Sequence, residues 1–343
     1  MKQHANNTPW MSDNKSPEAF FQPIGIDALL NQEFNFPKWI VEGLVPNEGI
    51  TIISAPPKSF KSWIALHFAL CIAQGEKAFG MRDCEKAGVL IIDEENHPRI
   101  IQERLLKLNT PANLPITFVS QKNFRLSNDE HIKKILELCD KVSASVIIMD
   151  SLVRIHDADE NNAVEIAKVF SYARSLCLAG KTVIMLHHER KEGFNSNSSP
   201  QSRMRGSSDI SASVDSHIAI RKDKAPNRLI IEPAQLRCDV LVDPFEVSVL
   251  EQSGKIEFSY YGEVDLPKTA SEKASEIIMT ILNRAGSEGL LHKYIVTMLQ
   301  NSHSIGEKNS RAAIKRLLSE GVLEEVKAGG GNGRLVRMKQ PRC

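Results

Sequence analysis

Short, unbroken apolar runs recur along the first part of the chain, and polar residues close each run. Such runs are typical of strands buried on both faces of a parallel sheet, because helices cover both sides of a sheet of that kind. Clear examples occupy residues 50–55, 88–93, 145–150, 182–188 and 216–222. The pattern therefore predicts an α/β fold built around a mostly parallel sheet.

The pattern changes near residue 267, where apolar residues begin to recur at helical spacing. Three groups indicate three helices: Ile277, Ile278, Ile281 and Leu282; Tyr294, Ile295, Met298 and Leu299; and Ile314, Leu317 and Leu318. Residues 304–307 have the form of a capping box that opens the third helix. Residues 322–327 and 334–339 predict two strands around a glycine-rich tip. Three helices and a hairpin together predict a winged helix-turn-helix domain.

These boundaries divide the chain into residues 1–35, 36–266 and 267–343. The first segment opens with a polar tail at residues 1–17, which we expect to be disordered. The apolar stretch at residues 19–30 is suited to docking, and its partner is either a neighbouring subunit or the core of the chain itself.

An apolar strand that runs into a tight turn and a long apolar helix occupies residues 50–74. This is the layout of a phosphate-binding loop, in which backbone N–H groups and a helix N-terminus converge on phosphate oxygens. The lysine of that motif reaches the β- and γ-phosphates and the serine hydroxyl binds Mg²⁺, roles that fall on Lys61 and Ser62. The predicted nucleotide-binding residues are Ala55, Pro56, Pro57, Lys58, Ser59, Phe60, Lys61 and Ser62.

The loop departs from the motif at two positions, because Ala55 and Phe60 replace its glycines. If residue 60 needs a positive φ, a phenylalanine there costs about 1–3 kcal/mol. A plain strand-to-helix turn is therefore the alternative interpretation.

Three of the predicted strands end in residues that can bind a metal ion or take part in catalysis. Asp150 closes one strand and suits a Mg²⁺ ligand in a phosphate-loop fold, an acidic cluster at residues 93–95 closes another, and His187 and His188 close the third. Ligands of open α/β sheets bind at the carboxyl ends of the strands. The sequence therefore predicts a site for ATP and Mg²⁺ at this edge, with one carboxylate available to activate water.

Composition is that of a soluble enzyme, with 343 residues, 42% of them hydrophobic and 25% charged. The six cysteines are widely spaced without a C-x-x-C pair, which favours a reducing compartment. No signal peptide or membrane span is evident, so we expect a cytoplasmic protein without membrane contact.

With these motifs in this order, the chain resembles the RecA-type ATPase core, and most of all the RepA-type hexameric ATPases of plasmids and other mobile elements. The resemblance covers about residues 36–265. It rests on residues 39–46, the Lys-Ser loop, the strand end at 93–96, residues 150–162, 186–191 and 205–208.

The resemblance implies a RecA-like ATPase domain at residues 36–266 that binds DNA as a hexamer. It implies that Glu95 is the general base. It also implies that His188 senses the γ-phosphate and passes the state of the nucleotide on to a DNA-binding loop at residues 190–204. That loop carries Arg190, Lys191 and Arg203. Composition alone would predict only a mobile loop there.

RecA-like ATPases receive positive charge from a neighbouring subunit at the transferred phosphoryl group. Arg221 and Lys222 follow the strand at 216–222 and are our candidates for this role. A solvated hairpin turn is the alternative for these residues.

The C-terminal segment is basic, with thirteen Lys and Arg against seven Glu from residue 268 onward, a net charge of +6. Lys308, Arg311 and Lys315 share one face of the third predicted helix, and Arg334 flanks the wing tip. Such an asymmetry indicates a module that binds duplex DNA, although many winged helices bind proteins instead.

The hypothesis from the sequence is thus a hexameric, DNA-dependent ATPase or helicase that moves on single strands during replication of a plasmid, phage or mobile element. The alternative is an ATP-switched DNA-binding regulator, or a helicase loader, with little hydrolysis.

Overall fold

The computed structural model of the chain describes residues 24–33, 38–189, 200–204, 208–237, 241–264, 270–327 and 334–339. These residues form two compact units that meet in sequence near residue 265. No helix in these ranges is long and apolar enough to cross a membrane. The tail predicted to be disordered, residues 1–17, lies outside the described residues.

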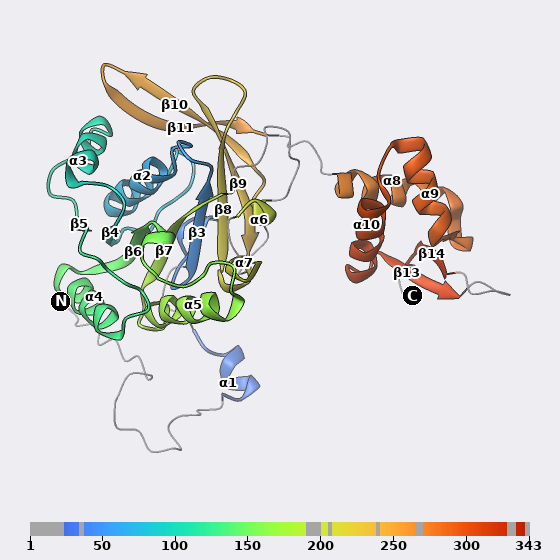
Figure 1. The fold of residues 1–343 in the computed structure, drawn as a ribbon, viewed down its shortest axis with the longest axis horizontal. Coiled ribbons are helices and arrows are strands. Elements are labelled where there is room, and N and C mark those ends of the chain that lie inside the picture. Colours follow the sequence, from blue (N-terminus) through green and yellow to red (C-terminus); the bar gives the residue numbers. More distant parts are fainter. Residues whose placement is uncertain are drawn as a thin grey trace. The chain divides into compact units, whose positions relative to one another are not determined.

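A nine-stranded sheet is the centre of the first unit (Figure 1), with the order β11-β10-β9-β8-β3-β7-β6-β4-β5. Its parallel part contains β3 (Ile50–Ala55), β4 (Gly88–Asp93), β5 (Ile116–Ser120), β6 (Ala144–Asp150), β7 (Thr182–His188) and β8 (Ser216–Lys222). An antiparallel extension contains β9 (Arg228–Leu236), β10 (Phe245–Gln252) and β11 (Lys255–Glu263). A separate pair joins β1 (Trp39–Val41) to β2 (Val45–Pro46).

All five strands predicted from apolar runs are present, and the predicted mostly parallel sheet is confirmed. Strands β5, β10 and β11 were not predicted. Each of the five residues of β5 is only half-buried, so this edge strand lacks the unbroken apolar run of a central strand.

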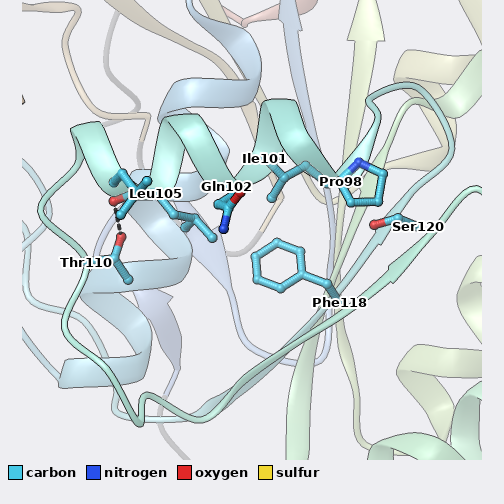
Figure 2. Close-up of a pocket in the computed structure, with 8 residues that line it drawn as sticks. Pro98, Ile101, Gln102, Leu105, Thr110, Phe118 and Ser120 are labelled. Atoms are coloured by element: carbon cyan, nitrogen blue, oxygen red, sulfur yellow. Dashed lines mark hydrogen bonds between the residues drawn. The ribbon is translucent and has the colours of Figure 1, made fainter.

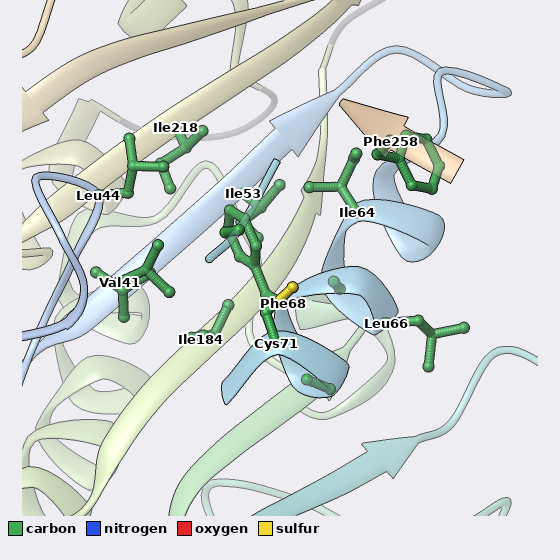
Figure 3. Packing of buried hydrophobic residues seen from close by; sticks show 14 of the residues in the cluster. Val41, Leu44, Ile53, Ile64, Leu66, Phe68, Cys71, Ile184, Ile218 and Phe258 are labelled. Carbon is green, nitrogen blue, oxygen red and sulfur yellow. The ribbon is translucent and has the colours of Figure 1, made fainter. Parts of the chain in front are cut away.

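Helices cover both faces of the sheet. They are α2 (Lys61–Gln74), α3 (Pro98–Lys107), α4 (Asp129–Val142) and α5 (Ala163–Leu178), with the short α6 (Pro200–Arg203) and α7 (Ser208–Ser213). Helix α2 is apolar nearly all round and its buried residues pack with β3, β7 and the β10–β11 hairpin, as Figure 3 shows around Phe68. Helices α4 and α5 enclose the second core on the other face.

The short helix α1 (Ile26–Leu30) opens the described part of this unit and buries none of its residues. Ile24, Ile26, Leu29 and Leu30 are all exposed. Residues 24–30, the described part of the apolar stretch expected to dock, therefore do not pack on the core of the described residues.

The second unit has its own apolar core, which includes Ile278, Ile295 and Ile314. Its elements are α8 (Ala270–Ala285), the 3₁₀ turn η3 (Gly286–Glu288), β12 (Leu290–Leu291), α9 (His292–His303), α10 (Glu307–Ser319), β13 (Leu323–Lys327) and β14 (Arg334–Met338). The three helices and two strands predicted from the spacing are present, and β12 adds a third strand in the order β12-β14-β13.

The predicted capping box was wrong. Ser304 ends α9 in a left-handed conformation, and Gly306 caps α10 without a side-chain hydrogen bond. Ser304 is the C-cap of α9, and the N-cap position of α10 falls two residues later, at Gly306. The serine is therefore not in the position from which a side chain caps the first N–H groups of α10.

Candidate functional site

The loop between β3 and α2 has the backbone of a phosphate cradle. Ala55 closes β3 in a fully buried position. Lys58 and Phe60 both have φ values of 62°, in the left-handed region. Phe60 caps α2 without a side-chain hydrogen bond, so no cap side chain satisfies the first N–H groups of that helix. Free N–H groups at a helix start favour an anion.

This loop forms one wall of a cavity of about 410 Å³ at the carboxyl edge of the sheet. The residues that line it come from the loop, the end of β4, α3, β7 and β8: Pro56, Pro57, Lys58, Ser59, Phe60, Lys61, Ser62, Trp63, Glu95, Asn96, Arg104, His188 and Lys222. Every predicted loop residue except the buried Ala55 therefore faces one cavity, together with the predicted base and sensor.

A second pocket lies between α3 and β5 and is apolar (Figure 2). Ile101, Leu105 and Phe118 dominate its walls, and none of its described lining residues is charged. It therefore does not suit a triphosphate, and the cavity under the loop is the better candidate for a nucleotide.

Lys61 and Ser62, predicted to bind phosphate and Mg²⁺, lie beside other predicted site residues. Lys61 is buried, and its Nζ lies 3.4 Å from His188 Nε2. Burial lowers the pKa of Lys61, and the carboxylates of Asp150 and Glu95 counteract this. The Ser62 hydroxyl donates to Asp150 Oδ2 at 2.7 Å. The two motif residues thus lie at the ends of two neighbouring strands, β7 and β6.

Asp150 is suited to holding a divalent cation. The pKa of Asp150 is raised to about 6, chiefly by burial and in part by nearby Asp93 and Glu95, while Lys61 and Ser62 oppose the rise. Its Oδ1 is buried without a hydrogen-bond partner in the described structure. A divalent cation would supply that missing partner and stabilise the charged form.

The described residues contain no group of three or more His, Cys, Asp or Glu placed to hold a metal alone. Mg²⁺ commonly takes one or two protein ligands plus substrate phosphates. The pair of Ser62 and Asp150 fits that pattern.

The two neighbouring glutamates at the end of β4 have different surroundings. The Glu94 carboxylate accepts N–H groups of Lys122, Asn123 and Phe124, each at 3.0 Å, and so holds the chain after β5. Glu95 instead lines the cavity, with Oε2 at 3.6 Å from His188 Nε2. Of the two, Glu95 is the carboxylate placed for chemistry.

Glu95 is held in its ionised form. The contact with His188 lowers its pKa to about 2, assisted by Lys61 and opposed by burial. The same His188 nitrogen faces both Lys61 and Glu95. An unprotonated Nε2 accepts from Lys61, whereas a protonated Nε2 donates to Glu95, so the tautomer decides which contact is a hydrogen bond.

Comparisons with known proteins agree with this geometry. Residues 16–193, more than half of the chain, match the AAA domain family. The chain belongs to this family. The matched region of the AAA domain contains the phosphate loop, Glu95, Asp150 and His188. No curated protein is similar enough in sequence to count as a relative.

Two solved structures share the fold of the AAA domain. One is described as an ATPase domain, with a TM-score of 0.51 at 11% identity over 63% of this chain and 86% of that chain. The other is a DnaB-like replicative helicase described with its interactions with primase, with a TM-score of 0.50 at 12% identity over 61% of this chain and 57% of that one. At these identities the likeness shows a common RecA-like fold.

Three residues that line the cavity of the AAA domain were not predicted from the sequence: Trp63, Asn96 and Arg104. Asn96 Nδ2 donates to Asp93 Oδ2 at 3.0 Å and to Asp150 Oδ2 at 3.3 Å, and so links two strand-end carboxylates. Arg104 lies with its guanidinium carbon 5.7 Å from the centroid of the Trp63 ring. The sequence feature that could have pointed to Arg104 as a site residue is its positive charge among the apolar residues of the segment at 98–108.

Arg221 and Lys222 lie at the end of β8 but have contacts within their own subunit. Lys222 Nζ lies 5.7 Å from the centroid of the Phe60 ring and lines the cavity. This differs from the expectation that Lys222 reaches a neighbouring site, because β8 is hydrogen-bonded to β3 and brings its end beside the loop. Arg221 Nε lies 3.3 Å from Glu232 Oε2.

Arg203, predicted to contact DNA, is not exposed in this conformation. Arg203 is buried and lies between Glu189 and Glu232, at 3.4 Å and 3.0 Å. A guanidinium enclosed by two carboxylates does not reach a phosphate on another molecule. The predicted contacts Arg190 and Lys191 lie outside the described residues.

The basic residues of the second unit divide into two groups. Arg311 is paired with Glu307 at 2.6 Å and Arg334 with Glu325 at 3.3 Å. Lys308 and Lys315 are exposed on α10. The lysines are therefore the more available anion contacts on this helix.

Proposed function

We propose that this protein is an ATP-dependent DNA motor, a ring-forming ATPase of the RepA type that acts in the cytoplasm during replication of a plasmid, phage or mobile element. One observation carries the proposal. Lys61, Ser62, Glu95 and His188, which come from three separate segments, line a single cavity at the carboxyl edge of a RecA-like sheet, and Asp150 accepts a hydrogen bond from Ser62.

The loop and α2 would bind the phosphates of ATP through backbone N–H groups and the Lys61 ammonium. Ser62 and Asp150 would hold Mg²⁺, which neutralises charge on the phosphates when it is bound. Arg104, stacked on Trp63 in the same cavity, supplies a further cation from α3.

Hydrolysis requires Glu95 to orient a water molecule and take its proton. Without nucleotide, Glu95 is occupied by His188, which also faces Lys61. A bound triphosphate competes with Glu95 for Lys61 and for the His188 ring because it carries more negative charge than one carboxylate. Nucleotide binding therefore releases Glu95 to act on water, and His188 reports the presence of the terminal phosphate.

We propose that the ring is a hexamer in which Arg221 reaches the site of a neighbour, while Lys222 serves the site of its own subunit. Arg221 must leave Glu232 to do so. Mixing Arg221→Ala subunits with Glu95→Gln subunits tests this division. Where an Arg221→Ala subunit binds the nucleotide and a Glu95→Gln subunit is its neighbour, the site between them contains both an intact Glu95 and an intact Arg221. Activity in the mixture above the sum of the separate variants supports action across the interface, and a strictly additive result opposes it.

The second unit is proposed to be a winged helix that docks on duplex DNA through α10, while residues 190–199 contact a single strand. Three helices with the strand order β12-β14-β13 and the exposed Lys308 and Lys315 support this assignment. The paired Arg311 and Arg334 argue for phosphate contacts by the lysines more than for base recognition by the arginines.

A steady-state ATPase assay with and without single-stranded DNA tests the function. We expect DNA-stimulated turnover in the wild type, none with Glu95→Gln, and near-normal turnover with Glu94→Gln, because Glu94 faces the chain after β5 instead of the cavity. Turnover that survives Glu95→Gln would remove the general-base assignment. Turnover without any response to DNA would leave an ATPase that is not a DNA motor.

The second candidate function, an ATP-switched DNA-binding regulator or a loader with little hydrolysis, is favoured by Phe60. Phe60 lines the cavity and its ring contacts Trp63 and Phe258, at a position where the phosphate-loop motif has glycine. Nucleotide binding with very slow turnover, unaffected by DNA, together with ATP-dependent binding to duplex DNA, would favour this regulator.

A further inference from the structure

A buried group of charged and polar side chains lies behind the nucleotide cavity, where β3, β7, β8 and β9 meet α6. We call it the Arg203 cluster, and its members are Ser54, Glu189, Arg203, His217 and Glu232. Each of these side chains belongs to a different element or segment end, and all five residues are buried. The cluster is separate from the residues that line the cavity.

Arg203 is the centre of the cluster. Its Nε lies 3.4 Å from Glu189 Oε2, and its Nη2 donates to Glu232 Oε2 at 3.0 Å. The same Glu232 oxygen lies 3.3 Å from Arg221 Nε. One arginine therefore bridges the end of β7 to β9, and Glu232 is shared with the arginine proposed to act across subunits.

Ser54 and His217 complete the surroundings of Glu189. The Ser54 hydroxyl donates to Glu189 Oε1 at 2.9 Å and lies 2.8 Å from His217 Nε2. Since the serine proton goes to the carboxylate, His217 must donate from Nε2. The pKa of His217 is lowered to about 3, chiefly by burial and in part by Arg203 and His187, so the ring is neutral.

The cluster sits at both ends of one segment. Glu189 follows the sensor His188 directly, and its N–H donates to the carbonyl oxygen of Ala55, the last residue of β3, at 3.1 Å. Glu189 also forms a bridge with Met204, which follows Arg203. The described residues on either side of this segment, Glu189 before it and Arg203 and Met204 after it, thus meet in one buried cluster, and Glu189 is also bonded to the start of the phosphate loop.

Burying charged groups in this way is a poor means of gaining stability. Desolvation of a buried ion pair usually offsets most of its attraction, and apolar residues of similar size often serve stability as well. Buried ionic networks are instead well suited to fixing one of two arrangements. The position of this network, between a nucleotide sensor and the base of a proposed DNA-contacting segment, points to such a role.

We propose that Arg203 is a positioning residue that couples the nucleotide site to residues 190–199, by clamping both ends of that segment to Glu189 and Glu232. This rests on the proposed function only in assigning the segment to DNA. A shift of His188 toward bound phosphate moves Glu189, and the arginine that bridges the two carboxylates carries that shift to the far end of the segment and to Glu232.

Arg203→Met tests the proposal because it keeps much of the length of the side chain and removes the charge. Arg174→Met is the matched control. Arg174 makes a two-armed contact with Asp215 at 2.7 Å and 3.2 Å, at the opposite edge of the same sheet, where Asp215 also accepts the N–H of Ile50. Loss of that pair perturbs the fold without touching the Arg203 cluster.

The first readout does not involve DNA. Trypsin cuts after Arg190 and Lys191, and its rate at these sites is measured with and without a non-hydrolysable ATP analogue and Mg²⁺. We expect a nucleotide-dependent rate in the wild type and in Arg174→Met. In Arg203→Met the rate should be the same with and without nucleotide, although a fluorescent ATP analogue still binds with an affinity within about threefold of the wild type.

The second readout is the ratio of DNA-stimulated to basal ATPase activity, which we expect to fall by about tenfold in Arg203→Met and to stay unchanged in Arg174→Met. If Arg203→Met does not fold, Glu232→Gln is used, which retains an acceptor for Arg203 and weakens the clamp.

A nucleotide-dependent cleavage rate that persists in the Arg203 and Glu232 variants would overturn the proposal, as would a wild-type rate that ignores nucleotide. If the cleavage result holds while the wild type shows no response to DNA, the clamp stands and the assignment to a DNA motor falls.

Discussion

The left-handed conformation of Phe60 leads to a prediction about two substitutions at one position. Phe60 has φ 62° and ψ 12° at the start of α2, a conformation that costs a residue with a side chain about 1–2 kcal/mol and costs glycine nothing. Its half-buried ring packs against Trp63 and Phe258. Removing the ring loses this packing, for which we take about 2 kcal/mol as a partly buried fraction of a core phenylalanine.

Phe60→Ala loses the ring and keeps the left-handed conformation. Phe60→Gly loses the same ring but removes the cost of the left-handed conformation. Against this, the greater freedom of glycine stabilises the unfolded chain by about 0.5–1 kcal/mol. The difference favours glycine by about 1 kcal/mol. In a domain of this size that corresponds to an unfolding temperature about 2–4 °C higher for Phe60→Gly than for Phe60→Ala, with both below the wild type.

Tryptophan fluorescence during thermal and urea unfolding measures this difference. All three tryptophans precede residue 265, so the second unit contributes no tryptophan to the signal. Equal stabilities for the two variants, or a more stable alanine variant, would refute the reasoning, because the left-handed backbone would then impose no cost at this position. Phe60→Gly above the wild type would show that the ring packing is worth less than the strain.

Three further predictions concern binding and stability. Lys61→Ala should abolish binding of a fluorescent ATP analogue, whereas Glu95→Gln should bind it normally and lose turnover; normal binding by the lysine variant would contradict the phosphate-loop assignment. In salt titrations of duplex DNA binding by fluorescence anisotropy, Lys308→Ala should lower the slope of log affinity against log salt by about 0.9, and Lys273→Ala on α8 should leave it unchanged. Burial lowers the pKa of His67 from 6.5 to about 4, so the unfolded chain binds a proton that the folded chain does not, and the free energy of unfolding should fall as the pH is lowered from 6.5 to 4. The slope from this residue is at most about 1.4 kcal/mol per pH unit, and urea unfolding of His67→Gln should show that much less acid sensitivity.

Much of the fold was already determined by the local pattern of the sequence. An unbroken apolar run has few options other than a strand buried on both faces, and the five runs became β3, β4, β6, β7 and β8. The helical spacing after residue 267 likewise produced α8, α9 and α10. Strands with half-exposed faces, such as β5, carry a weaker pattern and were missed.

The residues that gather at the candidate site were also largely readable, because a lysine and serine at a helix start and carboxylates at the ends of parallel strands lie at the same edge of such a sheet. What the sequence left open was which carboxylate faces the cavity. Glu94 and Glu95 are equivalent in the pattern, and only the three N–H groups after β5 that occupy Glu94 distinguish them.

The contacts of Arg203 and Lys222 were decided by the tertiary structure alone. Arg203 looks like a solvent-exposed loop residue in the sequence, yet two carboxylates from β9 and the end of β7 enclose it. Lys222 lies beside Phe60 only because β8 is a neighbour of β3 in the sheet, although the two strands are far apart in the chain. Strand order sets such contacts, and it depends on how helices pack on both faces of the sheet, which no local pattern of apolar and polar residues specifies.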